Sequence, residues 1–163
     1  DLVFLVGETR DDLSGSAWAE TIHGHLGGMP PLPDFDHEQR LAQMLVASAK
    51  GHLLSSAHDL GDGGLAQGLV ECCLGHDLAV SVSLPDGDPC VQLFAETPGR
   101  VLVSLPAANL DVFARLCAQH GLPLTRLGEV NRTGYLEIQE HFAVPVAELR
   151  ERWAAPIPAA MQH

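Results

Sequence analysis

The residues best suited to chemistry form a polar passage over residues 55–65, Ser-Ser-Ala-His-Asp-Leu-Gly-Asp-Gly-Gly-Leu, which runs directly into an amphipathic pattern. Glycines at such a junction let backbone amides approach a ligand, and a helix N-terminus carries a partial positive charge that favours phosphate oxygens. The carboxylates of Asp59 and Asp62 can hold the Mg²⁺ that accompanies a nucleotide. The passage therefore indicates a nucleotide site whose candidate backbone contacts are Gly61, Gly63 and Gly64.

A structural interpretation of the same passage stays open. Asp62 can simply cap the helix that follows, and His58 can be a hydrogen-bonded histidine of the core. Gly63 and Gly64 can be present only because the chain packs tightly there. The pattern alone does not decide between the two interpretations.

A second candidate passage is Ser14-Gly15-Ser16, which precedes Ala-Trp-Ala-Glu. Hydroxyls and amides at a helix start can contact a nucleotide, so Ser14 and Gly15 join the candidate residues. The passage lacks the lysine of a P-loop, and a structural loop is the alternative. A third passage, residues 96–100, has Glu96 and Arg100 beside a turn, for which an exposed ion pair is the default expectation.

The sequence lacks the motifs that are typical of several other chemistries. There is no GxSxG nucleophile elbow and no GxGxxG after a strand. The histidines show no HxxxH or HExxH spacing for a shared metal, so we expect most of them at the surface: His23, His25, His37, His52, His76, His120 and His141. These absences leave the phosphate interpretation as the main chemical hypothesis.

The periodicity of apolar residues predicts one α+β domain in which helices pack on a mixed sheet. Helices are expected at 36–50, where Asp36 and Gln39 can form the cap, at 65–73 between Gly63-Gly64 and Gly75, at 110–117, and after Pro145 with Val146, Leu149 and Trp153 on one face. Strands are expected at 2–6, 79–84, 100–105, 125–130 and 135–139, the last two forming a hairpin around residues 131–134.

Composition limits the possible partners and the compartment. The 163 residues include 9 Lys plus Arg and 21 Asp plus Glu, a net charge of −12, which disfavours nucleic acid and anionic membranes. No apolar run is long enough to cross a bilayer. Cys72, Cys73, Cys90 and Cys117 lack CxxC spacing, so we expect reduced thiols in a soluble, cytoplasmic protein.

The first residues predict a piece of a longer polypeptide. Asp1 leads at once into the buried strand over 2–6, where a natural start would carry a methionine. We expect residues 1–163 to be a single domain of that polypeptide, with residues 157–163 as a frayed tail.

Four passages, in this order and spacing, resemble a known family. They are Leu-Val-Gly-Glu-Thr-Arg-Asp-Asp-Leu-Ser-Gly-Ser-Ala-Trp (5–18), Ser-Ala-His-Asp-Leu-Gly-Asp-Gly-Gly-Leu-Ala (56–66), Leu-Phe-Ala-Glu-Thr-Pro-Gly-Arg-Val-Leu-Val (93–103) and Leu-Gly-Glu-Val (127–130). Together they look like the C-terminal domain of the phosphoribosylformylglycinamidine synthase family, within the superfamily related to aminoimidazole ribonucleotide synthetase.

The resemblance implies an ATP-dependent ligase of purine biosynthesis. In that family, ATP activates an amide oxygen of formylglycinamide ribonucleotide, and ammonia derived from glutamine replaces it. The implied partners are the N-terminal domains of the same chain, a glutaminase subunit and a small carrier subunit. The catalytic histidine and the ATP-contacting lysine belong to the N-terminal part, so the resemblance implies no catalytic residue here and an inactive isolated domain.

Residue by residue, the resemblance singles out Asp59, which matches an aspartate that reaches a magnesium ion beside nucleotide phosphates. Gly61 stands where many members have serine, which removes a hydroxyl contact. Glu96-Thr97-Pro98 occupies the place of a Glu-Ser-Gln substrate-binding stretch, and Pro98 removes an amide donor. The alternative implied by these departures is a structural or interaction module without a ligand site.

Overall fold

The computed structural model describes residues 1–75 and 78–161. The order of elements is β1 (Leu2–Val6), α1 (Ala17–His23), α2 (Phe35–Lys50), β2 (Ser56–Asp59), α3 (Gly64–Leu74), β3 (Ala79–Val82), α4 (Pro89–Phe94), β4 (Val101–Leu105), α5 (Leu110–Gln119), β5 (Leu124–Asn131), β6 (Tyr135–Ile138), β7 (Phe142–Pro145), α6 (Val146–Ala154) and α7 (Pro156–Ala160). A short 3-10 turn, Ala107–Asn109, precedes α5.

The strands form one mixed seven-stranded sheet in the order β2-β4-β1-β5-β3-β6-β7, which confirms the predicted fold class. The apolar strand β1 lies near its middle and pairs antiparallel with β4 and β5. Among the strands of the described residues, only β3 and β6 pair in parallel. A buried central strand explains why β1 carries an uninterrupted apolar run instead of an alternating one.

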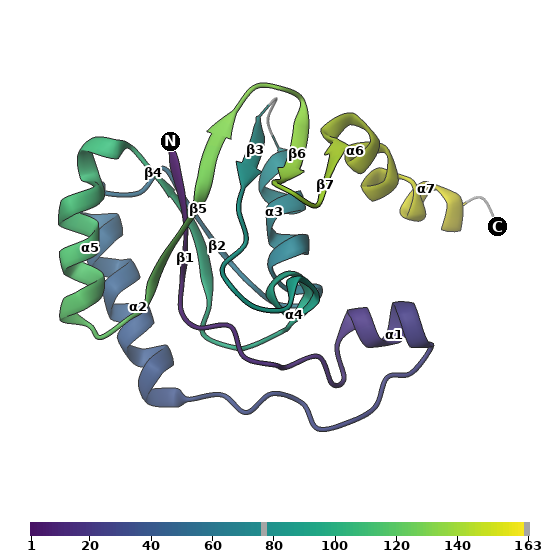
Figure 1. The fold of residues 1–163 in the computed structure, drawn as a ribbon, viewed down its shortest axis with the longest axis horizontal. Helices are drawn as coiled ribbons and strands as arrows, with labels where there is room; N and C mark the ends of the chain where they lie inside the picture. The colour runs from purple at the N-terminus through teal and green to yellow at the C-terminus, as the bar shows by residue number, and fades with distance from the viewer. Residues whose placement is uncertain (76–77, 162–163) are drawn as a thin grey trace.

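Helices cover both faces of the sheet (Figure 1). Alternate residues of β1 point to opposite sides: Val3 and Leu5 join the core with α3, α4 and α6, whereas Phe4 and Val6 join the core with α2 and α5. The helices over 36–50 and 65–73 were therefore predicted correctly as sheet-packing elements. They lie on different faces.

The predicted hairpin is wrong. Strands β5 and β6 do exist, but β3 lies between them and pairs with both. The turn after Asn131 therefore carries the chain past β3, and β6 pairs with β7 instead. Turn residues report a local reversal, and they carry no information about a strand inserted from elsewhere in the sequence.

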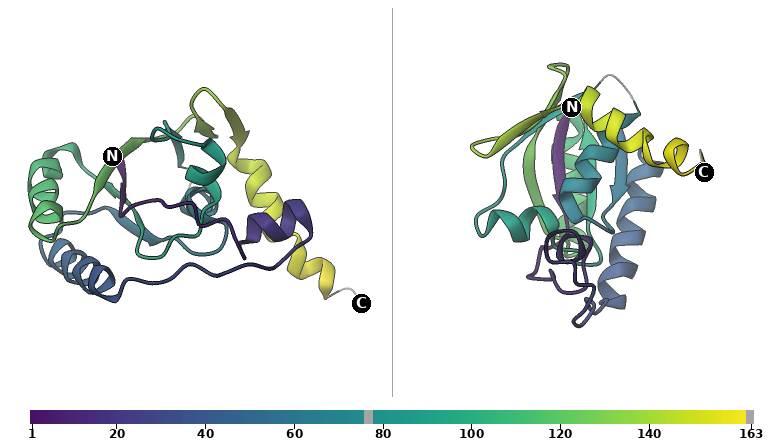
Figure 2. Two further views of the ribbon diagram at one scale, coloured as in Figure 1. Left: turned by 60° about the horizontal axis from the view of Figure 1, so that its bottom comes forward. Right: turned by 90° about the vertical axis from the view of Figure 1, so that its right-hand side faces the viewer.

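Two smaller expectations also change. The cap of α2 is Asp34, whose carboxylate accepts the His37 amide at 3.0 Å, so Asp36 lies inside the first turn. Backbone hydrogen bonding, from His37 first, lowers the pKa of Asp34. Pro156–Ala160 forms the exposed helix α7 in the stretch expected to fray, and α7 lies beyond α6, away from the sheet (Figure 2). His76 lies outside the described residues.

Candidate functional site

Asp59 is the last residue of β2, and its carboxylate is exposed. Strand β2 is at the edge of the sheet, where it pairs with β4 and ends opposite Val101. Within the described part of the chain, the Asp59 carboxylate has no hydrogen-bond or ion-pair partner. Its oxygens are therefore free for a ligand.

His58 is bound at both ring nitrogens. Nδ1 lies 2.6 Å from the Asp59 carbonyl oxygen, and Nε2 lies 2.9 Å from Glu71 Oε2 of α3. The ring is half-buried. These contacts agree with the structural interpretation of His58 as a satisfied histidine that ties β2 to α3.

Helix α3 begins on two glycines in the left-handed region. Gly63 is the N-cap residue, with φ of 78°, and no side chain caps the helix. The expectation that Asp62 is the cap is therefore wrong, and Asp62 is exposed. Gly64 has φ of 61° and lies against the end of α4, so the tight-packing interpretation is confirmed for this residue.

The Glu96 carboxylate reaches the start of α3. Its Oε1 accepts the Gly63 amide at 2.7 Å and the Ala17 amide of α1 at 2.8 Å. The Gly64 amide donates to the Gly61 carbonyl at 3.0 Å. The expectation that the amides of Gly63 and Gly64 are free for phosphate is therefore wrong in this conformation, because protein acceptors already bind both. Glu96 was not predicted for this role.

The second candidate passage is a turn that builds the cap of α1. The Ser16 hydroxyl donates to the Leu13 carbonyl at 2.6 Å and accepts the Ala19 amide at 3.2 Å. The Gly15 amide donates to the Gly27 carbonyl at 2.9 Å. Ser14 is exposed, so its hydroxyl is the group of this passage that faces solvent.

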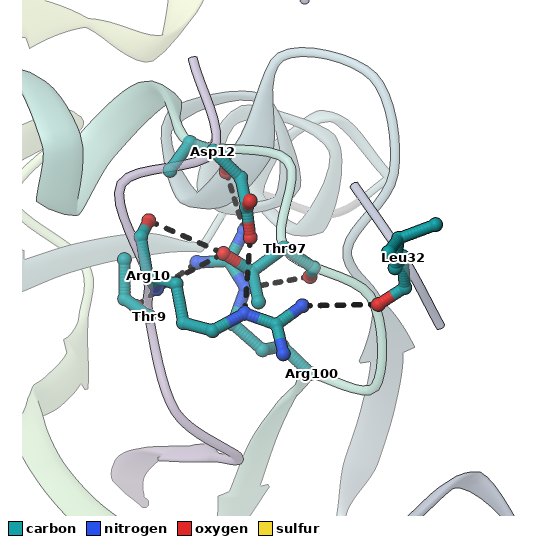
Figure 3. A network of polar contacts seen from close by, with 7 residues as sticks. Thr9, Arg10, Asp12, Leu32, Thr97 and Arg100 are labelled. Carbon is teal, nitrogen blue, oxygen red and sulfur yellow. Dashed lines mark hydrogen bonds and ion pairs between the residues drawn. The ribbon is translucent and has the colours of Figure 1, made fainter. Parts of the chain in front are cut away.

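The third passage is a buried junction (Figure 3). Arg100 is only 2% exposed, and its guanidinium donates to the carbonyls of Ala95 and Thr97 and to the Thr9 hydroxyl. Burial lowers the pKa of Arg100 to about 10. The Thr97 hydroxyl also accepts the Arg10 amide at 3.0 Å. The expected exposed ion pair between Glu96 and Arg100 is therefore wrong.

Asp59 lines a shallow hollow of ≈ 360 Å³ together with Glu38 of α2 and with Pro98, Gly99 and Arg100. Glu38 was not predicted as a site residue. It lies in the first turn of α2, where a negative charge is favourable. No group of three or more metal-ligating side chains occurs among the described residues. A metal ion at Asp59 would therefore need further donors from outside the described residues.

The fold and this loop cluster define a recognisable class. The family model described as AIR synthase related protein, C-terminal domain, matches residues 1–141. The chain belongs to this family. None of the helices in the described ranges is both long enough and apolar enough to span a membrane.

Two curated relatives resemble nearly the whole chain. The phosphoribosylformylglycinamidine synthase subunit PurL of Cutibacterium acnes is 51% identical over 162 residues, which are 99% of this chain and 22% of the relative. The same subunit of a Nocardioides species is 50% identical over 159 residues, 98% of this chain and 21% of the relative. The chain thus spans about a fifth of the length of these relatives.

A solved structure shows the same fold. Thermotoga maritima PurL complexed with FGAR matches 91% of this chain and 27% of its own length, with a TM-score of 0.78 and 21% sequence identity. At this identity the likeness supports the fold assignment alone.

Proposed function

We propose that this chain works as the C-terminal domain of a phosphoribosylformylglycinamidine synthase. The whole enzyme would form formylglycinamidine ribonucleotide from formylglycinamide ribonucleotide, ATP and glutamine-derived ammonia. The observation that carries the proposal is the 51% identity to the Cutibacterium acnes subunit over nearly the whole chain. The domain contributes no catalytic residue, and the reacting groups lie in the rest of the subunit.

The ligand proposed for the Asp59 edge is a magnesium nucleotide. Thermotoga maritima PurL has been solved complexed with ATP, which supports nucleotide binding in proteins of this kind. When bound, magnesium would neutralise phosphate charge, and Asp59 would hold it with donors from outside this chain. Gly61, Gly63 and Gly64 would shape the approach to that edge, with Ser14 and Gly15 on the neighbouring turn.

The proposed partners are the N-terminal domains of the same subunit, a glutaminase subunit and a small carrier subunit. The solved PurLQS assembly of Thermotoga maritima supports the two separate subunits. The net charge of −12 argues against nucleic acid and anionic membranes as partners. A cytoplasmic location belongs to the same proposal, supported by the four free cysteines.

A structural module without a ligand is the second candidate. It is favoured by the contacts of the Gly15, Gly63 and Gly64 amides, each of which already donates to a protein acceptor. In this case the domain would only support the rest of the subunit, where the reacting groups lie. The two candidates differ in whether Asp59 affects nucleotide binding.

The proposed function is tested in a chimeric subunit, in which this chain replaces the matching segment of Cutibacterium acnes PurL. We expect the chimeric subunit to form formylglycinamidine ribonucleotide from its ribonucleotide substrate, ATP and ammonia, and the 163-residue chain alone to form none. A subunit lacking the segment is the control. A chimeric subunit that melts like the parent but makes no product contradicts the proposal, as does turnover by the isolated chain.

A further inference from the structure

One carboxylate oxygen joins two segments that are far apart in the sequence. Glu96 Oε1 lies 2.7 Å from the Gly63 amide nitrogen, at the start of α3, and 2.8 Å from the Ala17 amide nitrogen, at the start of α1. Hydrogen bonds from amides to an ionised carboxylate are stronger than neutral ones, and negative charge is favourable at a helix N-terminus. The two helix starts therefore share one acceptor.

The backbone around Glu96 is fixed independently of this side chain. The Glu96 amide donates to the Asp12 carbonyl at 3.0 Å. On either side of Glu96, the carbonyls of Ala95 and Thr97 accept hydrogen bonds from the buried Arg100 guanidinium. A residue held in this way presents its carboxylate from a rigid turn, so Glu96 can set the position of the segments that it binds.

We propose that Glu96 is a positioning residue for Asp59. It holds the start of α3 against the start of α1, so that Asp59, four residues before Gly63, keeps a constant position relative to the Ser14–Ser16 turn. Glu96 uses its oxygen on the two amides and does not itself bind the nucleotide. The inference rests on the proposed function in one respect: the ligand whose affinity Glu96 controls is the magnesium nucleotide.

The coupling itself is tested on the 163-residue chain by amide hydrogen exchange at Gly63 and Ala17. Glu96→Ala removes the shared acceptor, and we expect exchange at both amides to accelerate together by about tenfold or more. Glu96→Gln keeps a carbonyl oxygen of the same reach and should restore most of the protection. Asp86→Asn removes one negative charge at an exposed position that neighbours neither amide in the sequence, so it should leave both exchange rates unchanged.

The effect of Glu96 on nucleotide binding is tested by titrating Mg-ADP into the chimeric subunit. Glu96→Ala should weaken binding at the Asp59 site by about tenfold, with Glu96→Gln within about threefold of the parent. If Glu96→Ala does not fold, Glu96→Asp replaces it: its carboxylate is one methylene shorter, so we expect it to protect only one of the two amides and to weaken binding.

Two outcomes overturn the inference. One is acceleration at Gly63 or Ala17 alone, or at neither, in folded Glu96→Ala. The other is coupled acceleration with Mg-ADP affinity equal to that of the parent, which would give Glu96 a purely structural role. If the parent chimeric subunit itself binds no Mg-ADP at the Asp59 site, the proposed ligand is wrong, whereas the exchange rates at Gly63 and Ala17 still show whether Glu96 couples the two segments.

Discussion

The α-carbon of Gly64 lies so close to the carbonyl oxygen of Ala95 that a β-carbon on residue 64 would be 2.5 Å from that oxygen. The contact joins the start of α3 to the end of α4, and it occurs at a left-handed φ of 61°. Both features exclude a side chain. The glycine that looked like a ligand contact in the sequence is thus first a requirement of packing.

Gly64→Ala should therefore destabilise the protein strongly. The left-handed backbone alone costs roughly 1–2 kcal/mol for a residue with a β-carbon, and the contact with Ala95 adds to it. We expect a loss above about 2 kcal/mol in urea unfolding. Gly61→Ala is the matched control, because nothing lies within 4 Å of its β-carbon position, and its change should stay within about 1 kcal/mol. Equal stabilities of the two variants would show that the contact is not tight.

Leu69 of α3 tests the packing of this helix on the sheet. Its side chain is 1% exposed in the core that includes Val3 and Leu5 of β1. Leu69→Ala should cost about 2–5 kcal/mol in the free energy of unfolding, because a cavity remains. Val46→Ala, at a side chain that is 53% exposed, should cost less than about 0.5 kcal/mol. A loss at Leu69 no larger than that at Val46 would mean that α3 faces the wrong way.

Arg100 tests the buried junction beneath the Glu96 turn. A lysine ammonium cannot reach the three acceptors of the guanidinium at once, so Arg100→Lys should cost on the order of 1–3 kcal/mol. Arg115→Lys, at an exposed position, should change stability by less than about 0.5 kcal/mol. Chemical denaturation of both variants measures the difference in the free energy of unfolding. An Arg100→Lys variant as stable as the parent would show that the three hydrogen bonds of Arg100 do not stabilise the fold.

Cys73 and Cys117 give the stability a pH dependence. Burial raises the pKa of each thiol from the ordinary value of 9.0 to about 11, so the folded protein keeps protons that the unfolded chain releases. Their contribution is fully present below pH 9 and is lost as pH rises towards 11. We expect the free energy of unfolding to fall between pH 9 and 11, with a smaller fall in the Cys73→Ala, Cys117→Ala double variant. The same slope in parent and variant would contradict this assignment.

Local patterns predicted most of the fold. The apolar spacing of Leu41 and Met44 located α2 within one residue of its observed start, because a helix face is encoded by residues three and four apart. Such patterns could not predict the order of the strands in the sheet, because β3, from an earlier part of the chain, lies between β5 and β6. Sequence spacing does not encode which strand becomes the neighbour.

The candidate site was predictable only in part. Residue types predicted the glycine start of α3, and they made Asp59 a candidate ligand, since a carboxylate before a glycine-rich helix start is a local signal. The role of Glu96 depends on two amides brought to it by the fold, and Glu38 shares a hollow with Asp59 only after α2 packs on the sheet. No spacing in the sequence gives these contacts.

Calorimetric titration of Mg-ADP into the chimeric subunit tests whether the Asp59 edge binds a magnesium nucleotide, as proposed. The ATP-contacting lysine implied by the resemblance lies in the N-terminal part of the subunit, so we expect the titration to report a second class of nucleotide site besides the Asp59 edge. Asp59→Asn should therefore weaken one class of site by about tenfold or more, with the melting temperature unchanged, because it removes a metal ligand that has no protein partner. Asp86→Asn, the same change at an exposed position outside the Asp59 hollow, should bind like the parent. If Asp59→Asn keeps the stoichiometry and affinity of the parent, the Asp59 edge is structural and does not hold a magnesium nucleotide.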